Sequence, residues 1–273
     1  MNSLERTLIT KTGYDHGWEV VIEDSAEQVV LGSALHHARA RVISPLPGSQ
    51  WVLSIQPKQL HTELERSYPG WYLTDECLGA DNEAELGLLL AQTSRLARAL
   101  PDEPCRRFAK AVAEELSPNN TTTTATEIER LVRQRVGQDI YRDSLMDYWG
   151  GACAVTGITV PALLRASHAK AWSECASDSE RLNVFNGFLL AAHLDALFDR
   201  HLMTFDEAGN AVFAPAIDQT LRAQLGLTGP VKLRWLSPEH RPFLHWHHAR
   251  FDGAAKSNAS SEGYTGGRRA HAV

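Results

Sequence analysis

Two aspartates four residues apart are the first feature of this sequence that points to chemistry. Asp195 and Asp199 lie in a short segment whose apolar residues have helical spacing. Residues four apart project from one face of a helix, where two like charges repel each other unless a cation lies between them. Carboxylate oxygens suit Mg²⁺ or Mn²⁺, which keep several waters and accept phosphate oxygens as further ligands. The spacing therefore predicts one divalent ion at these aspartates, although a solvated helix face would show the same spacing.

A histidine upstream of these aspartates is the candidate general base. An imidazole has an ordinary pKa of about 6.5, so much of it is neutral at physiological pH and able to take a proton from water. We hypothesise that His168 activates a water for in-line attack on a phosphodiester. The metal would stabilise the anionic phosphorus and the leaving 3′-oxygen. Considered alone, a histidine such as His168 is more often an ordinary, partly buried residue than a general base.

Four short motifs surround these residues in a fixed order. They are Cys153-Ala-Val-Thr156-Gly157, Ala166-Ser167-His168-Ala169-Lys170, Asn186-Gly187-Phe188-Leu189-Leu190 and Leu194-Asp195-Ala196-Leu197-Phe198-Asp199. This order resembles the HNH endonuclease family, in the branch with a C-x-x-T-G opening, an A-S-H base motif, N-G-x-L-L and a closing L-D-x-x-F-D. The resemblance covers residues 141–213 and leaves residues 1–116 unassigned.

The resemblance implies a ββα-metal finger, in which two strands carry the base and its loop and a helix carries the metal ligands. It also implies that Asn186 orients the loop of His168 rather than contacting the metal. Asn183 is the other candidate for this middle position, but Asn186 fits better because a glycine and a Leu-rich strand follow it. Two positions depart from the family pattern. Asp195 stands where the third letter is histidine, and Ser167 stands where many members place an acidic or histidine ligand.

Further residues are candidates for phosphate contact or for a second metal. Arg165, Ser167, Lys170 and Asn183 could bind substrate phosphates, although Arg165 and Lys170 are equally typical of surface charges. A second metal site is the weaker interpretation. Of the four C-terminal histidines, only three could approach one another: His240, His247 and His248. Cys153 and Cys175 each lack the nearby partner cysteine of a zinc site.

The strands and helices that the sequence predicts indicate an α+β protein. Short Val- and Ile-rich strands are expected at 18–22, 28–31, 40–43 and 51–55, followed by helices at 82–100 and 104–116. Residues 1–116 therefore read as a small α+β module, and the Thr-rich segment 117–125 as a linker. Residues 126–252, with helices from 126 and at 140–149, a hairpin at 203–213 and a strand at 231–235, would form the nuclease domain. Residues 253–273 read as a disordered tail.

Composition and charge indicate the cellular compartment and the class of binding partner. The chain has 273 residues, a formal net charge of −6 and a pI of about 6.1. An acidic balance argues mildly against a nucleic-acid partner, so local arginines or a metal would have to supply the attraction. Four scattered cysteines favour a reducing cytoplasm, and neither a secretory signal nor a transmembrane run is visible.

The sequence thus predicts a metal-dependent HNH endonuclease that acts on DNA, with restriction, phage defence or a toxin as compatible roles. The alternative is a catalytically silent nucleic-acid-binding or sensor protein with a degenerate HNH fold. We expect the N-terminal module to provide targeting, either by reading a DNA feature or by forming a homodimer or binding a protein partner.

Overall fold

The computed structural model describes residues 1–44, 50–74, 77–116 and 125–262, and the chain forms two compact units. The first comprises residues 1–151 with 177–184, and the second comprises residues 152–176 with 185–273. The sequence placed the domain boundary at 117–125. The division falls near residue 151 instead, because the long helix that follows this segment packs on helices of the first unit. Residues 117–124 of the predicted linker lie outside the described residues, and Ala125 already belongs to that helix.

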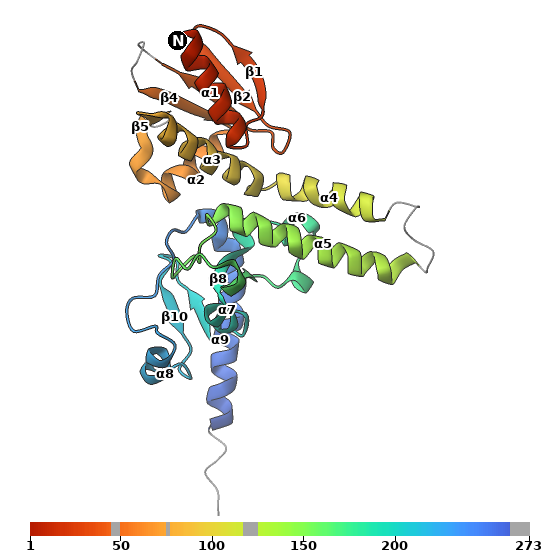
Figure 1. The fold of residues 1–273 in the computed structure, drawn as a ribbon. Coiled ribbons are helices and arrows are strands. Elements are labelled where there is room, and N and C mark those ends of the chain that lie inside the picture. The colour runs from red at the N-terminus through yellow and green to blue at the C-terminus, as the bar shows by residue number, and fades with distance from the viewer. Residues whose placement is uncertain (45–49, 75–76, 117–124, 263–273) are drawn as a thin grey trace, which may run out of the picture. The chain divides into compact units, whose positions relative to one another are not determined.

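The first unit is built on a six-stranded antiparallel sheet (Figure 1). In sheet order its strands are β1 (Val20–Asp24), β2 (Gln28–Gly32), β3 (Arg39–Ile43), β4 (Trp51–Gln56), β6 (Cys77–Ala80) and β5 (Tyr72–Thr74). Burial alternates along β3, where Ala40 and Val42 are buried and Arg39 and Arg41 are exposed. Because successive side chains point to opposite faces of a sheet, one face forms the core and the other carries polar groups.

Helices complete the first unit. They are α1 (Ser3–Asp15), α2 (Lys58–Ser67), α3 (Glu83–Ala99), α4 (Glu103–Glu115), α5 (Ala125–Tyr148) and the short α6 (Asp178–Arg181). Helices α1 and α3 pack against each other and against the sheet. The sequence analysis expects no helix before residue 82, which is wrong about α1 and α2. A capping box of Asn2 and Glu5 starts α1 and was the signal available for it.

Helix α5 is continuous, whereas the sequence predicted two helices, one from residue 126 and one at 140–149. A single glycine, Gly137, is the only break in the pattern, and a helix interior tolerates one glycine at a cost of about 1 kcal/mol. The helix ends where predicted, because Gly150 and Gly151 adopt φ values of 64° and 71°. Helices α4 and α5 lie side by side (Figure 1).

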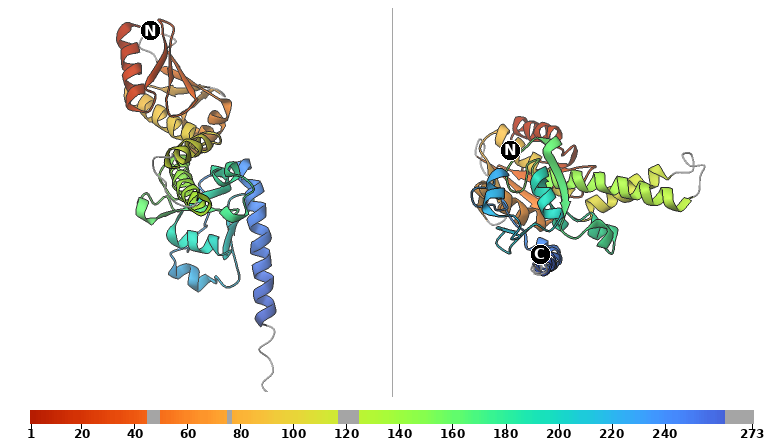
Figure 2. Two further views of the ribbon diagram at one scale, coloured as in Figure 1. Left: turned by 90° about the vertical axis from the view of Figure 1, so that its right-hand side faces the viewer. Right: turned by 90° about the horizontal axis from the view of Figure 1, so that it is seen from below.

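The described residues of the second unit, 152–176 and 185–262, form two small antiparallel pairs, three helices and several tight turns. Strands β7 (Leu164–His168) and β8 (Gly187–Ala191) form one pair, and β9 (Met203–Phe205) and β10 (Ala211–Phe213) form the predicted hairpin. The helices are α7 (Ala192–Asp199), α8 (Gln219–Gln224) and α9 (Arg241–Glu262), which runs along the rest of this unit (Figure 2). The 3₁₀ turns of the chain are η1 (Pro69–Trp71), η2 (Pro161–Leu163), η3 (Trp172–Glu174), η4 (Val184–Asn186) and η5 (Pro238–His240).

Two C-terminal predictions need correction. The predicted strand at 231–235 is reduced to an isolated bridge between Lys232 and Asn210. The disordered tail was predicted from residue 253, which is too early, because α9 continues through Glu262. Alanines at 254, 255 and 259 are strong helix formers, which explains why the helix extends past Gly253. Residues 263–273 lie outside the described residues. No helix in the described ranges combines the length and apolarity needed to span a bilayer.

Candidate active site

The β7–β8 pair and helix α7 carry the residues that the sequence selected. The strands pair from Leu164 opposite Ala191 to His168 opposite Gly187, and α7 begins directly after β8. All five residues of β8 are buried, which matches its continuous apolar run. Helix α7 packs on β7 as well as on β8. Two strands and one helix therefore form a single small layer around the candidate residues.

His168 is the last residue of β7 and is half-buried. Its ring lies edge-on to the indole of Trp172, with 5.7 Å between the ring centroids. The strand end leads into the loop 169–171, so the position of the imidazole depends on how that loop is held.

Asn186 holds this loop from inside the protein. Its side chain is fully buried, and its Oδ1 accepts a hydrogen bond of 2.8 Å from the backbone N–H of Lys170. Its Nδ2 donates to the carbonyl oxygen of Lys170 at 3.2 Å and to Sγ of Cys175 at 3.3 Å. The backbone carbonyl of Asn186 also accepts from the N–H of Ala169 at 3.0 Å. One amide side chain thus satisfies both backbone polar groups of Lys170, two residues after His168.

Ser167 joins β7 to α7. Its side chain is buried, and its hydroxyl donates a hydrogen bond to the carboxylate of Asp195, in the first turn of the helix. A carboxylate near a helix N-terminus is favoured by the helix dipole. The residue before His168 is therefore tied directly to one of the predicted metal ligands.

Asp199 is the last residue of α7 and is exposed. It lies one helical turn after Asp195, so both carboxylates are on the same side of α7, as the spacing predicts. The end of the helix is held by histidines. His247 is buried and stacks on Phe198 with 3.9 Å between the ring centroids, and its Nε2 lies 2.9 Å from the Phe198 carbonyl oxygen. Burial lowers the pKa of His247 to about 4, which keeps the ring neutral at pH 7.

His201 completes this contact. Its Nδ1 lies 3.1 Å from Nε2 of His247, and it adopts a φ of 53°. Burial and the charge of Arg250 lower the pKa of His201, while Asp199 acts in the opposite direction. Two neutral rings therefore hold the C-terminal end of α7 next to Asp199.

One family model matches the segment that carries this arrangement. Residues 153–206 match the model of a family described as HNH endonuclease. Within these bounds, the chain is similar to HNH endonucleases. The resemblance that the motifs indicated is thereby confirmed, and it suggests nuclease activity on nucleic acids. A comparison with curated proteins finds no match.

The opening motif of the HNH domain builds the turn before the hairpin. Cys153 is fully buried, and its Sγ accepts hydrogen bonds from the N–H groups of Ala191 at 3.2 Å and of Thr156 at 3.4 Å. Gly157 closes the turn with a φ of 71°. The sequence analysis used Cys153 as the first residue of this motif and weighed it as a zinc ligand, and the structure gives it a supporting position. It supports the junction of β8 and α7.

The predicted phosphate contacts lie in different environments. Arg165 is exposed on β7, and its guanidinium donates to the carbonyl oxygens of Ala162 and Leu164 at 3.0 and 2.9 Å. Lys170 is half-buried in the loop that Asn186 holds. Asn183 belongs to the first compact unit, so the structure does not group it with the other candidates.

The four C-terminal histidines do not converge on a second site. His240 is buried and stacks on Phe188, with 5.2 Å between the ring centroids, while Nε2 of His245 lies 3.6 Å from a carboxylate oxygen of Glu207. Within the described residues, no three or more His, Cys, Asp or Glu side chains are arranged to hold an ion.

The donors of the HNH domain nevertheless fit one class of ion. Asp195 and Asp199 offer carboxylate oxygens, and a hard cation such as Mg²⁺ is commonly held by one or two carboxylates, with water and substrate phosphates completing its shell. A structural zinc site would need four closely placed nitrogen or sulfur ligands, which the described residues do not supply.

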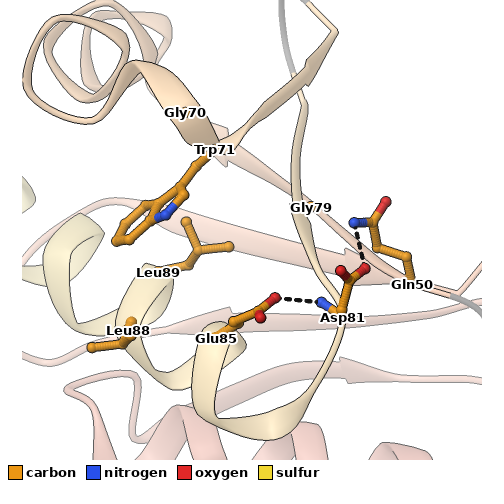
Figure 3. A pocket seen from close by; sticks show the side chains of 8 residues that line it. All are labelled: Gln50, Gly70, Trp71, Gly79, Asp81, Glu85, Leu88 and Leu89. Carbon is orange, nitrogen blue, oxygen red and sulfur yellow. Dashed lines mark hydrogen bonds between the residues drawn. The ribbon is translucent and has the colours of Figure 1, made fainter.

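A cavity in the first unit offers no comparable chemistry. It has a volume of about 320 Å³ and is lined by Trp71, Leu88, Leu89, Asp81, Glu85 and neighbouring residues (Figure 3). Its two carboxylates are already engaged. Gln50 donates to Asp81 at 2.7 Å, and the N–H of Asp81 donates to Glu85 at 2.8 Å. These contacts fix the start of α3 rather than present a reactive group.

Proposed function

We propose that this chain is a metal-dependent endonuclease that hydrolyses phosphodiester bonds of DNA, with His168 as the general base. The proposal depends mainly on one contact. The Ser167 hydroxyl binds the carboxylate of Asp195, and it thereby ties the strand end that carries His168 to the helix that carries the acidic residues. This contact lies within the segment that matches the HNH endonuclease family.

The chain's own residues account for the proton transfer. His168 takes a proton from a water whose oxygen attacks phosphorus in line with the departing 3′-oxygen. As the new P–O bond forms, the bond to the 3′-oxygen breaks. Asn186 keeps the loop after His168 in one conformation through its hydrogen bonds to the backbone N–H and carbonyl oxygen of Lys170. Such positioning matters because misplacement of a catalytic group by about 1 Å can cost about 100-fold in rate.

Asp195 and Asp199 are the residues that would hold the ion, with Mg²⁺ or Mn²⁺ as the candidates. When bound, such an ion neutralises charge on the phosphate and on the leaving oxygen. Ser167 keeps the Asp195 carboxylate in place beside β7. Arg165 and Lys170 supply positive charge from the strand and the loop that flank His168, and we assign them to phosphate contacts.

A plasmid-nicking assay tests the proposal. Supercoiled plasmid is incubated with the full chain in Mg²⁺, in Mn²⁺ and in EDTA. We expect nicking only with a metal, and a loss of about 100-fold or more in His168→Ala, because general bases contribute roughly 10²–10⁴ in rate. His245→Ala is the matched control, since His245 is exposed and lies outside the hairpin and α7. Nicking by His168→Ala at the rate of the His245→Ala control would exclude His168 as the base.

A second pair of variants tests the ligand assignment. Asp195→Asn should lower the rate and raise the Mg²⁺ concentration needed for half-maximal nicking. Asp139→Asn, an exposed aspartate on α5, makes the same chemical change elsewhere and should leave both quantities unchanged.

A catalytically silent nucleic-acid-binding or sensor module is the second candidate. It is favoured by one observation: Ser167 is engaged by Asp195, so the position before the base offers a hydroxyl instead of a carboxylate. Binding of DNA by the full chain without nicking in either metal would support this second function and refute the first.

A further inference from the structure

The first unit contains a groove whose charge is opposite to that of the whole chain. Its volume is about 830 Å³, and it extends over β3, β4 and the start of α2. The residues that line it are His37, Arg39, Arg41, Ser54, Ile55, Gln56, Pro57, Lys58, His61 and Cys77. These include three permanent cations and no carboxylate.

The lack of acidic side chains among the lining residues is also visible in the sequence. No aspartate or glutamate occurs between Glu27 and Glu63, although the chain contains 33 acidic residues and has a net charge of −6. The segment that builds β2, β3 and β4 therefore carries only positive and neutral side chains. Arg39, Arg41 and Lys58 are therefore the permanently charged groups among the residues that line the groove.

The two arginines of β3 are available to a ligand. Arg39 and Arg41 are exposed and occupy alternate positions, so both lie on the face of the sheet that does not form the core. Neither forms an ion pair with a carboxylate among the residues that the structure describes; Arg41 contacts the neutral side-chain oxygen of Gln28. Other arginines of this unit behave differently, as Arg98 does with Asp147 at 3.0 Å.

The strand register places neutral hydrogen-bonding groups beside these cations. Arg39 is directly opposite Gln56 of β4, and Arg41 is directly opposite Ser54. Two successive cross-strand pairs thus each combine a guanidinium with a hydroxyl or an amide. Arginine, lysine, serine and glutamine side chains are the groups that proteins commonly use to contact phosphate oxygens of DNA.

We propose that this groove binds the sugar-phosphate backbone of duplex DNA, with Arg39, Arg41 and Lys58 as the phosphate-contacting cations. The choice of DNA among polyanions rests on the nuclease function proposed above. The groove is broad and open and lies on a sheet face, which suits a polymer backbone. Because these contacts would be to phosphates, they would attach the chain to DNA without reading its sequence.

Fluorescence anisotropy with a labelled DNA duplex tests this site in the full chain. EDTA is present, so that cleavage does not affect the measurement. The groove variant is Arg39→Gln/Arg41→Gln/Lys58→Gln. Each lost phosphate contact should make the slope of log K against log salt shallower by about 0.9, which gives about 2.7 for three contacts. At 0.15 M salt this corresponds to an affinity loss on the order of 100-fold.

Matched controls separate the groove from net charge and from misfolding. Lys11→Gln/Lys110→Gln/Arg130→Gln removes the same charge from exposed sites of the first unit and should change the slope far less. Arg39→Lys/Arg41→Lys keeps the charge and should retain most of the affinity. Inorganic phosphate at an equal phosphate concentration should not displace the duplex, because it cannot occupy three contacts at once.

Alkylation of cysteines tests directly whether the DNA lies in the groove. Cys77 lines the groove, whereas Cys105 does not, and both side chains are half-buried. DNA should slow alkylation of Cys77 relative to that of Cys105. A groove variant with the wild-type salt slope and affinity would overturn the proposal, as would displacement of the duplex by inorganic phosphate. Both readouts are independent of nicking, so a chain that binds DNA through the groove but fails to cut it would refute only the nuclease function.

Discussion

Replacement of Asn186 by alanine is the sharpest test of how the site is held. The side chain is fully buried, and it satisfies both the N–H and the carbonyl of Lys170. Leaving a buried backbone group without a partner costs about 1–3 kcal/mol. If Asn186→Ala loses about 2 kcal/mol at the N–H, that amide should exchange with solvent about 30-fold faster, since 1.4 kcal/mol corresponds to a factor of ten. The loop after His168 would then sample other conformations, and plasmid nicking should fall with it.

Native-state hydrogen exchange, followed by mass spectrometry of peptides that contain Lys170, measures this effect. Asn186→Asp separates the two bonds, because an aspartate can still accept from the N–H but presents an oxygen to the Lys170 carbonyl and to Cys175. It should keep the amide protected better than alanine does, yet still impair nicking. Asn183→Ala is the control, since the HNH resemblance alone left both asparagines open. Unchanged exchange and unchanged nicking in Asn186→Ala would refute the positioning role.

Three further substitutions probe the supports of α7. Ser167→Ala removes the hydroxyl that binds the half-buried Asp195 carboxylate, so we expect a loss of about 1 kcal/mol in unfolding free energy by urea titration and slower nicking; a wild-type urea midpoint would contradict this. Cys153→Ala leaves the N–H of Ala191 without its sulfur acceptor and should cost about 1–3 kcal/mol, with Cys153→Ser less harmful because it keeps an acceptor. Burial holds the pKa of His247 at about 4 in the folded protein, below its ordinary value of 6.5. Its contribution to stability is therefore complete above pH 6.5 and is lost as the pH falls toward 4. His247→Gln should reduce the difference between the urea midpoints at pH 7 and pH 5, and an unchanged difference would show that another group titrates.

Strands β1 to β4 could be predicted because their composition is a local signal, whereas β5 and β6 were missed. Val- and Ile-rich segments bounded by polar or Pro/Gly stretches identified β1 to β4 within two residues. The helices α1 and α2 were missed because their apolar residues are few, and burial against the sheet, which is not visible in the sequence, stabilises them. The unit boundary was misplaced for a related reason: a Thr-rich segment looks like a linker, but contacts made by α5 decide to which unit that helix belongs.

The candidate residues could be predicted because they occur in ordered motifs, but their supports could not. The tie from Ser167 to Asp195 spans 28 positions, and the contact between His201 and His247 spans 46. No periodicity or spacing rule predicts such pairs, since they depend on how strands and helices pack. The sequence drew attention to His247 as a metal ligand, whereas burial and stacking on Phe198 make it a support for α7.

The charge of the chain illustrates why local structure outweighs composition in judging a nucleic-acid partner. A net charge of −6 predicts weak attraction to DNA if all charges act from one point. At physiological ionic strength, however, exposed charges are largely screened beyond about 8 Å. A phosphate in the groove would therefore be influenced mainly by the charges nearest to it, and the lining residues supply Arg39, Arg41 and Lys58. If the groove binds DNA, raising the salt concentration should weaken binding in proportion to these local contacts, as it does for basic proteins, despite the acidic total.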